Sequence, residues 1–209
     1  MHRIAFLGPP GAGKGTQATV LAQQLGIPHL STGDLLRAAV AARTAIGREA
    51  QQHMDAGRLV PDELVLRVLT ERISRPDAAS GFLLDGYPRN LAQAEALARI
   101  TPLDVVVAFD LPFPVLIERL SGRRVCPTCQ TVYNIESRPP RTPGVCDRDG
   151  TALVQRPDDL PAAVRTRLEV YAEQTAPLER YYTEKGLLRT LDARGDPQDV
   201  TQRLVALIR

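Results

Sequence analysis

A glycine-rich segment near the beginning of the chain has the composition of a phosphate-binding loop. Residues 8–16 read GPPGAGKGT, which follows the pattern G-x-x-x-x-G-K-[ST] except that Gly15 stands between Lys14 and Thr16. Its glycines allow successive backbone N–H groups to face phosphate oxygens. Lys14 can reach the β- and γ-phosphates, and the Thr16 hydroxyl can contact Mg²⁺. We therefore expect a nucleoside triphosphate to bind at Gly11, Ala12, Gly13, Lys14, Gly15 and Thr16.

The elements on either side of this loop strengthen the interpretation. An apolar run at residues 4–7 predicts a buried strand before the loop, and residues 14–25 predict a helix after it. The helix N-terminus adds a partial positive charge where an anion would lie. This context argues against a simple glycine-rich turn. The loop does not define the reaction, because translocating ATPases, GTPases and small-molecule kinases share it.

A second group of residues has the spacing of metal ligands. Cys126, Cys129, Cys146 and Asp149 form C-x-x-C and C-x-x-D pairs separated by sixteen residues. This spacing is typical of a small zinc ribbon with four tetrahedral ligands, a structural site. Asp149 is preferred to Asp147 because it repeats the spacing of the first pair. A redox C-x-x-C motif and a metal-free segment remain as alternatives.

Composition excludes several classes of protein. The chain has 209 residues, with 44% hydrophobic and 24% charged residues, which suits one globular domain with small insertions. A net charge of +2 gives no argument for a nucleic-acid partner. Three cysteines argue against a disulfide framework. Because no apolar run is long enough to span a bilayer, we expect a cytoplasmic protein with no membrane partner.

Strand-like and helical patterns alternate along the chain, which predicts an α/β fold: a parallel sheet with helices on both faces. The final helix is marked by Asp196 as N-cap and Pro197 as its first residue. Strands are predicted at residues 3–7, 27–30, 81–85, 105–110 and 187–192, and helices at 14–25, 35–42, 61–74, 91–100 and 112–120. Two segments, about 30–60 and 123–154, break the alternation and are interpreted as insertions.

Further residues indicate a second phosphate site. Ser31 can cap a helix with Asp34 three residues later, and Arg37 follows within about the first turn. The segment Asp85-Gly86-Tyr87-Pro88-Arg89-Asn90 follows a predicted strand, at the carboxyl edge where open α/β sheets bind ligands. Beside a phosphate-binding loop, we expect Arg89 to face a phosphate rather than solvent.

Five motifs, in order, together resemble the adenylate kinase family: residues 8–16, 31–37, 85–93, 119–124 and 158–167. The resemblance implies the reaction Mg·ATP + AMP ⇌ 2 ADP and a monomer. It also implies a P-loop core with a five-stranded parallel sheet at 1–30, 61–122 and 155–209, an AMP-binding insertion at 31–60 and a lid at 123–154.

The resemblance also assigns roles to individual residues. Some bacterial adenylate kinases bind structural zinc in the lid through three Cys and one Asp, which supports the ligand set above. Asp85 would hold a water on Mg²⁺, and the transferring phosphoryl would be met by Lys14, Arg89, Arg123, Arg156 and Arg167. ATP would also contact Arg119, Val132, Tyr133 and Gly195. AMP would contact Thr32, Arg37, Arg58, Leu59, Val60, Gly86, Tyr87, Pro88, Arg89, Gln93, Arg156 and Arg167.

The acceptor base is inferred from a few positions. UMP/CMP kinases typically carry alanine where this chain has Thr32, and an Asp-Asn pair soon after the P-R-N motif. Here Asn90 is followed by Leu91-Ala92-Gln93, the adenylate pattern. AMP is therefore the expected acceptor, and a kinase for UMP or CMP is the alternative. Tyr87 stands where many members have phenylalanine.

The expected chemistry needs cations rather than a general base. The acceptor is a phosphate oxygen that is already ionised, and arginines can align and stabilise the transferring group. A nucleic-acid-binding ATPase would call for a basic, aromatic surface, whereas aromatic residues make up 4% here. A catalytically inactive binding module is disfavoured because the expected catalytic positions are filled. His2, His29 and His53 show no ligand spacing and are expected at the surface or in turns.

Overall fold

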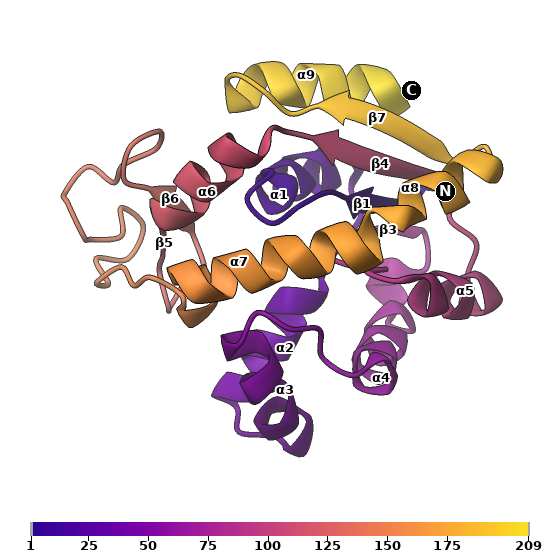
Figure 1. Ribbon diagram of the computed structural model, residues 1–209, viewed down its shortest axis with the longest axis horizontal. Coiled ribbons are helices and arrows are strands. Elements are labelled where there is room, and N and C mark those ends of the chain that lie inside the picture. The colour runs from indigo at the N-terminus through magenta and orange to yellow at the C-terminus, as the bar shows by residue number, and fades with distance from the viewer. Residues whose placement is uncertain (1, 209) are drawn as a thin grey trace.

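The computed structural model describes residues 2–208, and its core is a five-stranded parallel sheet (Figure 1). The strand order is β2-β3-β1-β4-β7, with every pairing parallel. This confirms the predicted α/β class. The short strand β2 lies slightly later than expected, because His29 to Ser31 pair with the end of β3. The strands are β1 His2–Leu7, β2 His29–Ser31, β3 Gly81–Asp85, β4 Val105–Asp110 and β7 Leu188–Asp192.

Alternating side chains of the strands build two separate cores. In β1, Ala5 and Leu7 point to one face, whereas Ile4 and Phe6 point to the other. Each fully buried aliphatic or aromatic side chain contributes about 1.5–3 kcal/mol. The first face is covered by α2 (Thr32–Ala41), α4 (Asp62–Ile73), α5 (Leu91–Ile100) and α8 (Pro177–Glu184), and the second by α1 (Lys14–Leu25), α6 (Phe113–Ser121), α7 (Pro161–Val170) and α9 (Pro197–Ile208).

The two segments that interrupt the predicted alternation project from the sheet in different directions (Figure 1). The first carries α2 and α3 (Ala45–Asp55), and α2 begins at Thr32 because the Ser31 Oγ accepts a hydrogen bond from the Asp34 N–H at 3.2 Å. The second carries an antiparallel hairpin of β5 (Arg123–Val125) and β6 (Val132–Asn134).

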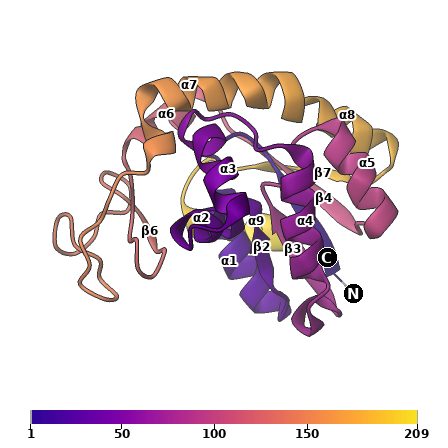
Figure 2. The same ribbon diagram turned by 90° about the horizontal axis from the view of Figure 1, so that it is seen from below.

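A nearly continuous run of helix crosses the molecule from the base of the β5–β6 segment (Figure 2). It consists of α7, a π-helical turn η3 (Tyr171–Thr175) and α8. This run of helix is not among the elements predicted from the sequence. Single 3₁₀ turns occur at η1 (Pro76–Ala78) and η2 (Pro157–Asp159), the second just before α7. Between residues 2 and 208, every helix is too short or too polar to traverse a membrane.

Candidate functional site

A cavity of about 850 Å³ opens at the carboxyl ends of the parallel strands. Its walls come from the loop before α1, the start of α2, the β5–β6 segment, and the run of α7 and η3. This is the edge where ligands bind in open α/β sheets. The two segments that interrupt the predicted alternation and the glycine-rich loop therefore line the same cavity.

The glycine-rich loop is shaped to receive an anion. Gly11 has φ +87°, and a Cβ there would lie 3.0 Å from the Leu116 carbonyl oxygen, so a side chain would be strained. Helix α1 starts at Lys14 with no side chain capping it, which leaves backbone N–H groups for a ligand. Lys14 Nζ donates to the carbonyls of Gly8 at 2.6 Å and Pro9 at 2.8 Å.

Lys14 is half-buried among other cationic side chains. Burial lowers its pKa to about 8, Asp85 opposes that shift, and the nearby Arg89, Arg167 and Arg123 add to it. An ammonium group in such surroundings is stabilised by an added negative charge. A bound phosphate would supply that charge.

Asp85 lies at the end of β3 and faces His29, whose Nε2 is 3.5 Å from Asp85 Oδ2. Burial alone would raise the pKa of Asp85, but the nearby His29 imidazole and the charge of Lys14 keep it below the usual value. The expectation that His29 lies at the surface or in a turn is wrong. It is half-buried in β2, and β2 is the direct neighbour of β3.

Two of the predicted arginines are held by largely buried carboxylates. Arg123 donates through Nε, at 2.7 Å, and Nη2 to the fully buried Asp159. Arg167 Nη1 lies 3.0 Å from both Asp159 and Asp158. Such charge-assisted contacts fix the orientation of a guanidinium group.

Arg156 completes this group, although its ion pair is longer. Its Nη2 lies 3.9 Å from Asp34 Oδ1, and its side chain is 14% exposed. Burial lowers the pKa of Arg156 to about 10, which leaves it charged at neutral pH. The carboxylates that hold these arginines, Asp34, Asp158 and Asp159, are functional residues that the sequence analysis does not assign.

Arg89 also lines the cavity and is half-buried. Its Nε donates to the Gly86 carbonyl at 2.7 Å, and its N–H donates to Gln93 Oε1 at 2.8 Å. Burial lowers its pKa to about 10, and the positive charge of Arg167 acts in the same direction. Lys14, Arg89, Arg123, Arg156 and Arg167 all line this cavity, so the structure brings the five predicted catalytic cations together.

A small hollow adjoins the cavity beside α2 and α5, lined by Leu36, Leu59, Val60 and Val65 together with polar groups. Thr32 Oγ1 donates to the Gly86 carbonyl at 2.8 Å. The Gln93 side-chain amide is already engaged, since Nε2 donates to Asp62 Oδ1 at 2.7 Å while Oε1 accepts from Arg89. The other predicted AMP contacts at the main cavity are Arg37, Arg58, Leu59, Val60, Gly86, Pro88, Arg156 and Arg167.

Tyr87 is placed differently from the other predicted AMP contacts. Its side chain is fully buried in the core, and it does not line either hollow among the described residues. Its hydroxyl donates to the Gln93 carbonyl at 3.3 Å, and burial raises its pKa to about 12. Tyr87 therefore packs in the hydrophobic core and does not share the cavity with the other predicted AMP contacts.

Residues predicted to contact ATP also line the cavity. Arg119, Val132, Tyr133 and Gly195 line it together with the glycine-rich loop and Asp85. The loop containing Gly195 is attached to α1, because Gln17 Nε2 donates to the Pro197 carbonyl at 2.9 Å.

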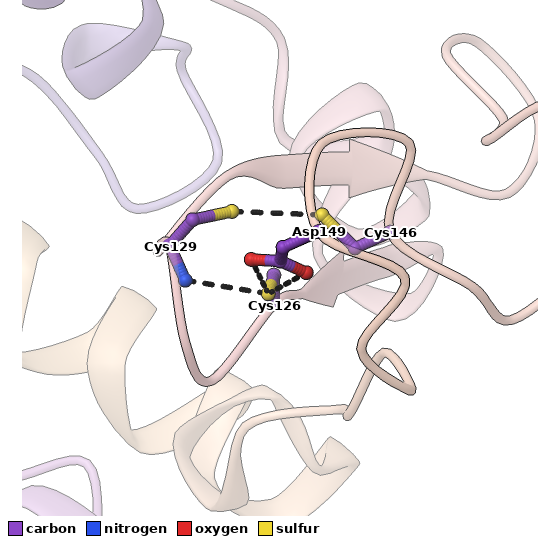
Figure 3. A group of neighbouring side chains, drawn as sticks. All are labelled: Cys126, Cys129, Cys146 and Asp149. Carbon is purple, nitrogen blue, oxygen red and sulfur yellow. Dashed lines mark hydrogen bonds between the residues drawn. The ribbon is translucent and has the colours of Figure 1, made fainter.

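The predicted metal ligands converge in the β5–β6 segment (Figure 3). The ligand atoms of Cys126, Cys129, Cys146 and Asp149 all lie within 4.8 Å of one another. The Cys129 and Cys146 sulfurs are 3.5 Å apart, and Cys126 Sγ is 3.3 Å from an Asp149 carboxylate oxygen. The Thr151 N–H donates a hydrogen bond to the Asp149 carboxylate, and this contact keeps the pKa of Asp149 well below its usual value. Three thiols and an ionised carboxylate in this arrangement fit a tetrahedral divalent ion.

Tyr133 connects this cluster to the cavity. Its hydroxyl accepts a hydrogen bond from the Asp147 N–H at 2.9 Å and lies 3.5 Å from Cys146 Sγ, although the residue also lines the large cavity. The cluster is thus part of the packing that shapes the wall of the site.

Comparison with known proteins gives one consistent family. A family model described as adenylate kinase matches residues 6–187. The adenylate kinase of Thermodesulfovibrio yellowstonii is 49% identical over 211 residues, which cover 99% of this chain and 98% of the relative. That of Moorella thermoacetica is 51% identical, covering 91% and 90%, and that of Bacillus subtilis is 48% identical, covering 94% and 93%.

Proposed function

The chain belongs to the adenylate kinase family, and we propose how its residues carry out the reaction Mg·ATP + AMP ⇌ 2 ADP. It is a phosphotransferase whose acceptor is a phosphate group, and its activity would supply ADP and balance the adenine nucleotides. One observation carries the proposed roles: five cations from distant parts of the sequence line one cavity of about 850 Å³, and a small apolar hollow adjoins it.

ATP is proposed to bind along the glycine-rich loop. Its phosphates would meet the loop N–H groups and Lys14, and its base would lie between Arg119 and the loop at Gly195. Val132 and Tyr133 would cover it from the β5–β6 side.

AMP is proposed to enter from the side of α2. Its base would occupy the apolar hollow near Thr32, Val60 and Gln93, and its phosphate would face Arg37 and Arg89. Arg58, Leu59, Gly86 and Pro88 would complete the wall.

The transfer would proceed by direct displacement between phosphate oxygens. The AMP phosphate oxygen attacks the γ-phosphorus of ATP, the bond to the β-phosphate oxygen breaks, and ADP leaves. Arg89, Arg123, Arg156 and Arg167 would stabilise charge on the transferring group. Carboxylates would hold Arg123, Arg156 and Arg167 in place beforehand, and the Gly86 carbonyl would hold Arg89. No side chain has to take a proton, because the attacking oxygen is ionised at neutral pH.

Two metal ions belong to the proposal. Mg²⁺ would be held by the Thr16 hydroxyl and, through water, by Asp85, which are oxygen donors of the kind it prefers. When bound, it neutralises charge on the β- and γ-phosphates. Structural Zn²⁺ would be held by Cys126, Cys129, Cys146 and Asp149, whose donor atoms fit it, and would stiffen a segment with only a small core of its own.

We divide the chain functionally into a core at 1–30, 61–122 and 155–209, an AMP-binding segment at 31–60 and a lid at 123–154. Closure of the two segments over both nucleotides would exclude water, the competing acceptor. We further propose a cytoplasmic monomer; the three reduced cysteines support a reducing compartment.

The acceptor is tested with a coupled assay that supplies Mg·ATP and, separately, AMP, GMP, CMP and UMP. Rapid formation of ADP with AMP alone is expected. A preference for CMP or UMP would keep the phosphoryl-transfer mechanism but contradict the proposed base pocket. Hydrolysis of ATP without transfer to any monophosphate would contradict the proposed mechanism.

A further inference from the structure

The π-helical turn η3 ends at Thr175, a buried residue on the wall of the cavity. Its hydroxyl donates a hydrogen bond of 2.7 Å to the backbone carbonyl of Arg89, which is 86 residues away in the sequence. A buried backbone carbonyl needs a partner, and here a side chain from another element provides it. This contact therefore connects the α7–η3–α8 run directly to the loop that carries Arg89.

The Arg89 residue is fixed on three sides. Its N–H is bonded to Gln93, its carbonyl to Thr175, and its guanidinium Nε to Gly86. The first two contacts set the position of the backbone from which the side chain extends. Gln93 and Gly86 belong to the same loop and helix as Arg89, whereas Thr175 alone of these partners comes from a distant element, η3.

The π turn accounts for the direction in which Thr175 points. In an uninterrupted α-helix, a residue eight positions after Arg167 would be turned by about 80° from its face. A π turn contains one additional residue, so Thr175 takes about the angular position of a seventh residue, within about 20° of Arg167. Both Arg167 and Thr175 line the cavity.

We propose that Thr175 is a positioning residue for phosphoryl transfer: through the Arg89 carbonyl it holds that guanidinium in register with Arg167. The inference rests on the proposed role of Arg89 at the transferring phosphate. A misplacement of the order of 1 Å at such a group can lower the rate by about a hundredfold. The loss of the Thr175 hydroxyl should act mainly on steps that involve AMP and the transfer, and little on the binding of ATP alone.

The test compares Thr175→Val, which removes the hydroxyl at nearly constant size, with Thr175→Ser, which keeps it. We expect the valine variant to lose about tenfold to a hundredfold in kcat/KM for AMP, with the Kd for Mg·ATP within about twofold of wild type. The serine variant should stay within about threefold of wild type. If the valine variant does not fold, Thr175→Ala replaces it.

Thr183→Val provides a matched control. The Thr183 hydroxyl also donates to a backbone carbonyl at 2.7 Å, that of Glu179, but it is exposed and within its own helix α8. It should leave kcat/KM within about twofold of wild type. Equal losses in Thr175→Val and Thr183→Val would overturn the proposal, and so would a fully active, folded Thr175→Val.

A double-mutant cycle tests whether the loss of activity in Thr175→Val arises through Arg89. In the Arg89→Ala background, Thr175→Val should cost less than about threefold, because no guanidinium remains to be positioned. A loss of tenfold or more in that background would overturn the inference while leaving the proposed function intact. A wild-type enzyme that does not transfer phosphate to AMP would instead overturn the proposed function, and the inference with it.

Discussion

Removal of the Arg123 guanidinium tests the proposed arginine cluster most sharply. Arg123 is 18% exposed, and its Nε and Nη2 are bound to Asp159. Asp159 does not engage Nη1, which can therefore reach a phosphate at the cavity. A desolvated arginine on a transferring phosphoryl group contributes about 10³-fold in rate, or about 4 kcal/mol. We expect Arg123→Ala to lower kcat/KM by about that factor.

The same substitution also lowers stability, and the two effects have to be measured separately. Asp159 is fully buried and would lose two of its three side-chain hydrogen bonds from arginines, keeping the one from Arg167. Removing one partner of a buried ion pair costs about 3–5 kcal/mol, and the retained Arg167 should keep the cost at the lower end. Urea denaturation gives this value, and kinetics are then measured under conditions where the variant is folded.

The assay is a coupled measurement of ADP formation from Mg·ATP and AMP at 25 °C, repeated in the reverse direction. Arg165→Ala is the matched control, because Arg165 is exposed on α7 and does not line the cavity. It should remain within about twofold of wild type. A loss of less than about tenfold in folded Arg123→Ala would refute the assignment of Arg123 to the transferring phosphoryl group.

Three further predictions concern the metal cluster, pH and the acceptor base. Asp149→Ala, or removal of the metal by a chelator, should lower the melting temperature, as measured by calorimetry. The same change should alter kcat at 25 °C by less than about twofold. A large loss of kcat while the lid stays folded would contradict a purely structural site. Burial lowers the pKa of Lys14 to about 8 in the free enzyme, and only the protonated form attracts phosphate. ATP affinity should therefore fall as pH rises through 8, by about tenfold between pH 7 and pH 9 in calorimetric titrations, and a flat profile would show that Lys14 stays charged. Thr32→Ala should reduce the preference for AMP over CMP and UMP, because the Thr32 hydroxyl holds the Gly86 carbonyl at the small hollow proposed for the base of AMP. An unchanged ratio of kcat/KM values for the three acceptors would show that Thr32 does not select the base.

Local sequence signals predict the parts of the fold that rest on local physics. The strands at 81–85 and 105–110 and the helices at 14–25 and 91–100 have the predicted bounds, because each is a strongly apolar or periodic segment with clear limits. The glycine-rich loop is equally local. The metal cluster is also predicted, since the spacing of Cys126, Cys129, Cys146 and Asp149 reflects two short turns.

Helices α7 and α8 are harder to detect because their apolar faces are narrow. Helix α7 buries Ala163, Val164 and Leu168 between charged residues, and Pro177 then interrupts the periodicity at the start of α8. The π turn between them shifts the phase once more. No single helical period fits the whole run.

The residues that support the site are non-local and leave little signal in the sequence. His29 meets Asp85 only because β2 pairs with β3, and Asp159 meets Arg123 across 36 residues. Thr175 meets Arg89 across 86 residues. The partners of these residues, Asp85, Arg123 and Arg89, belong to sequence motifs and could be predicted. The contacts themselves depend on how the chain folds back on itself.

The most direct test of the account is ³¹P NMR of the enzyme with Mg²⁺ and ADP as the sole nucleotide. ATP and AMP should appear in equal amounts until equilibrium is reached, with no inorganic phosphate. An unchanged ADP spectrum, or growth of inorganic phosphate in place of ATP and AMP, would contradict reversible phosphoryl transfer in this cavity.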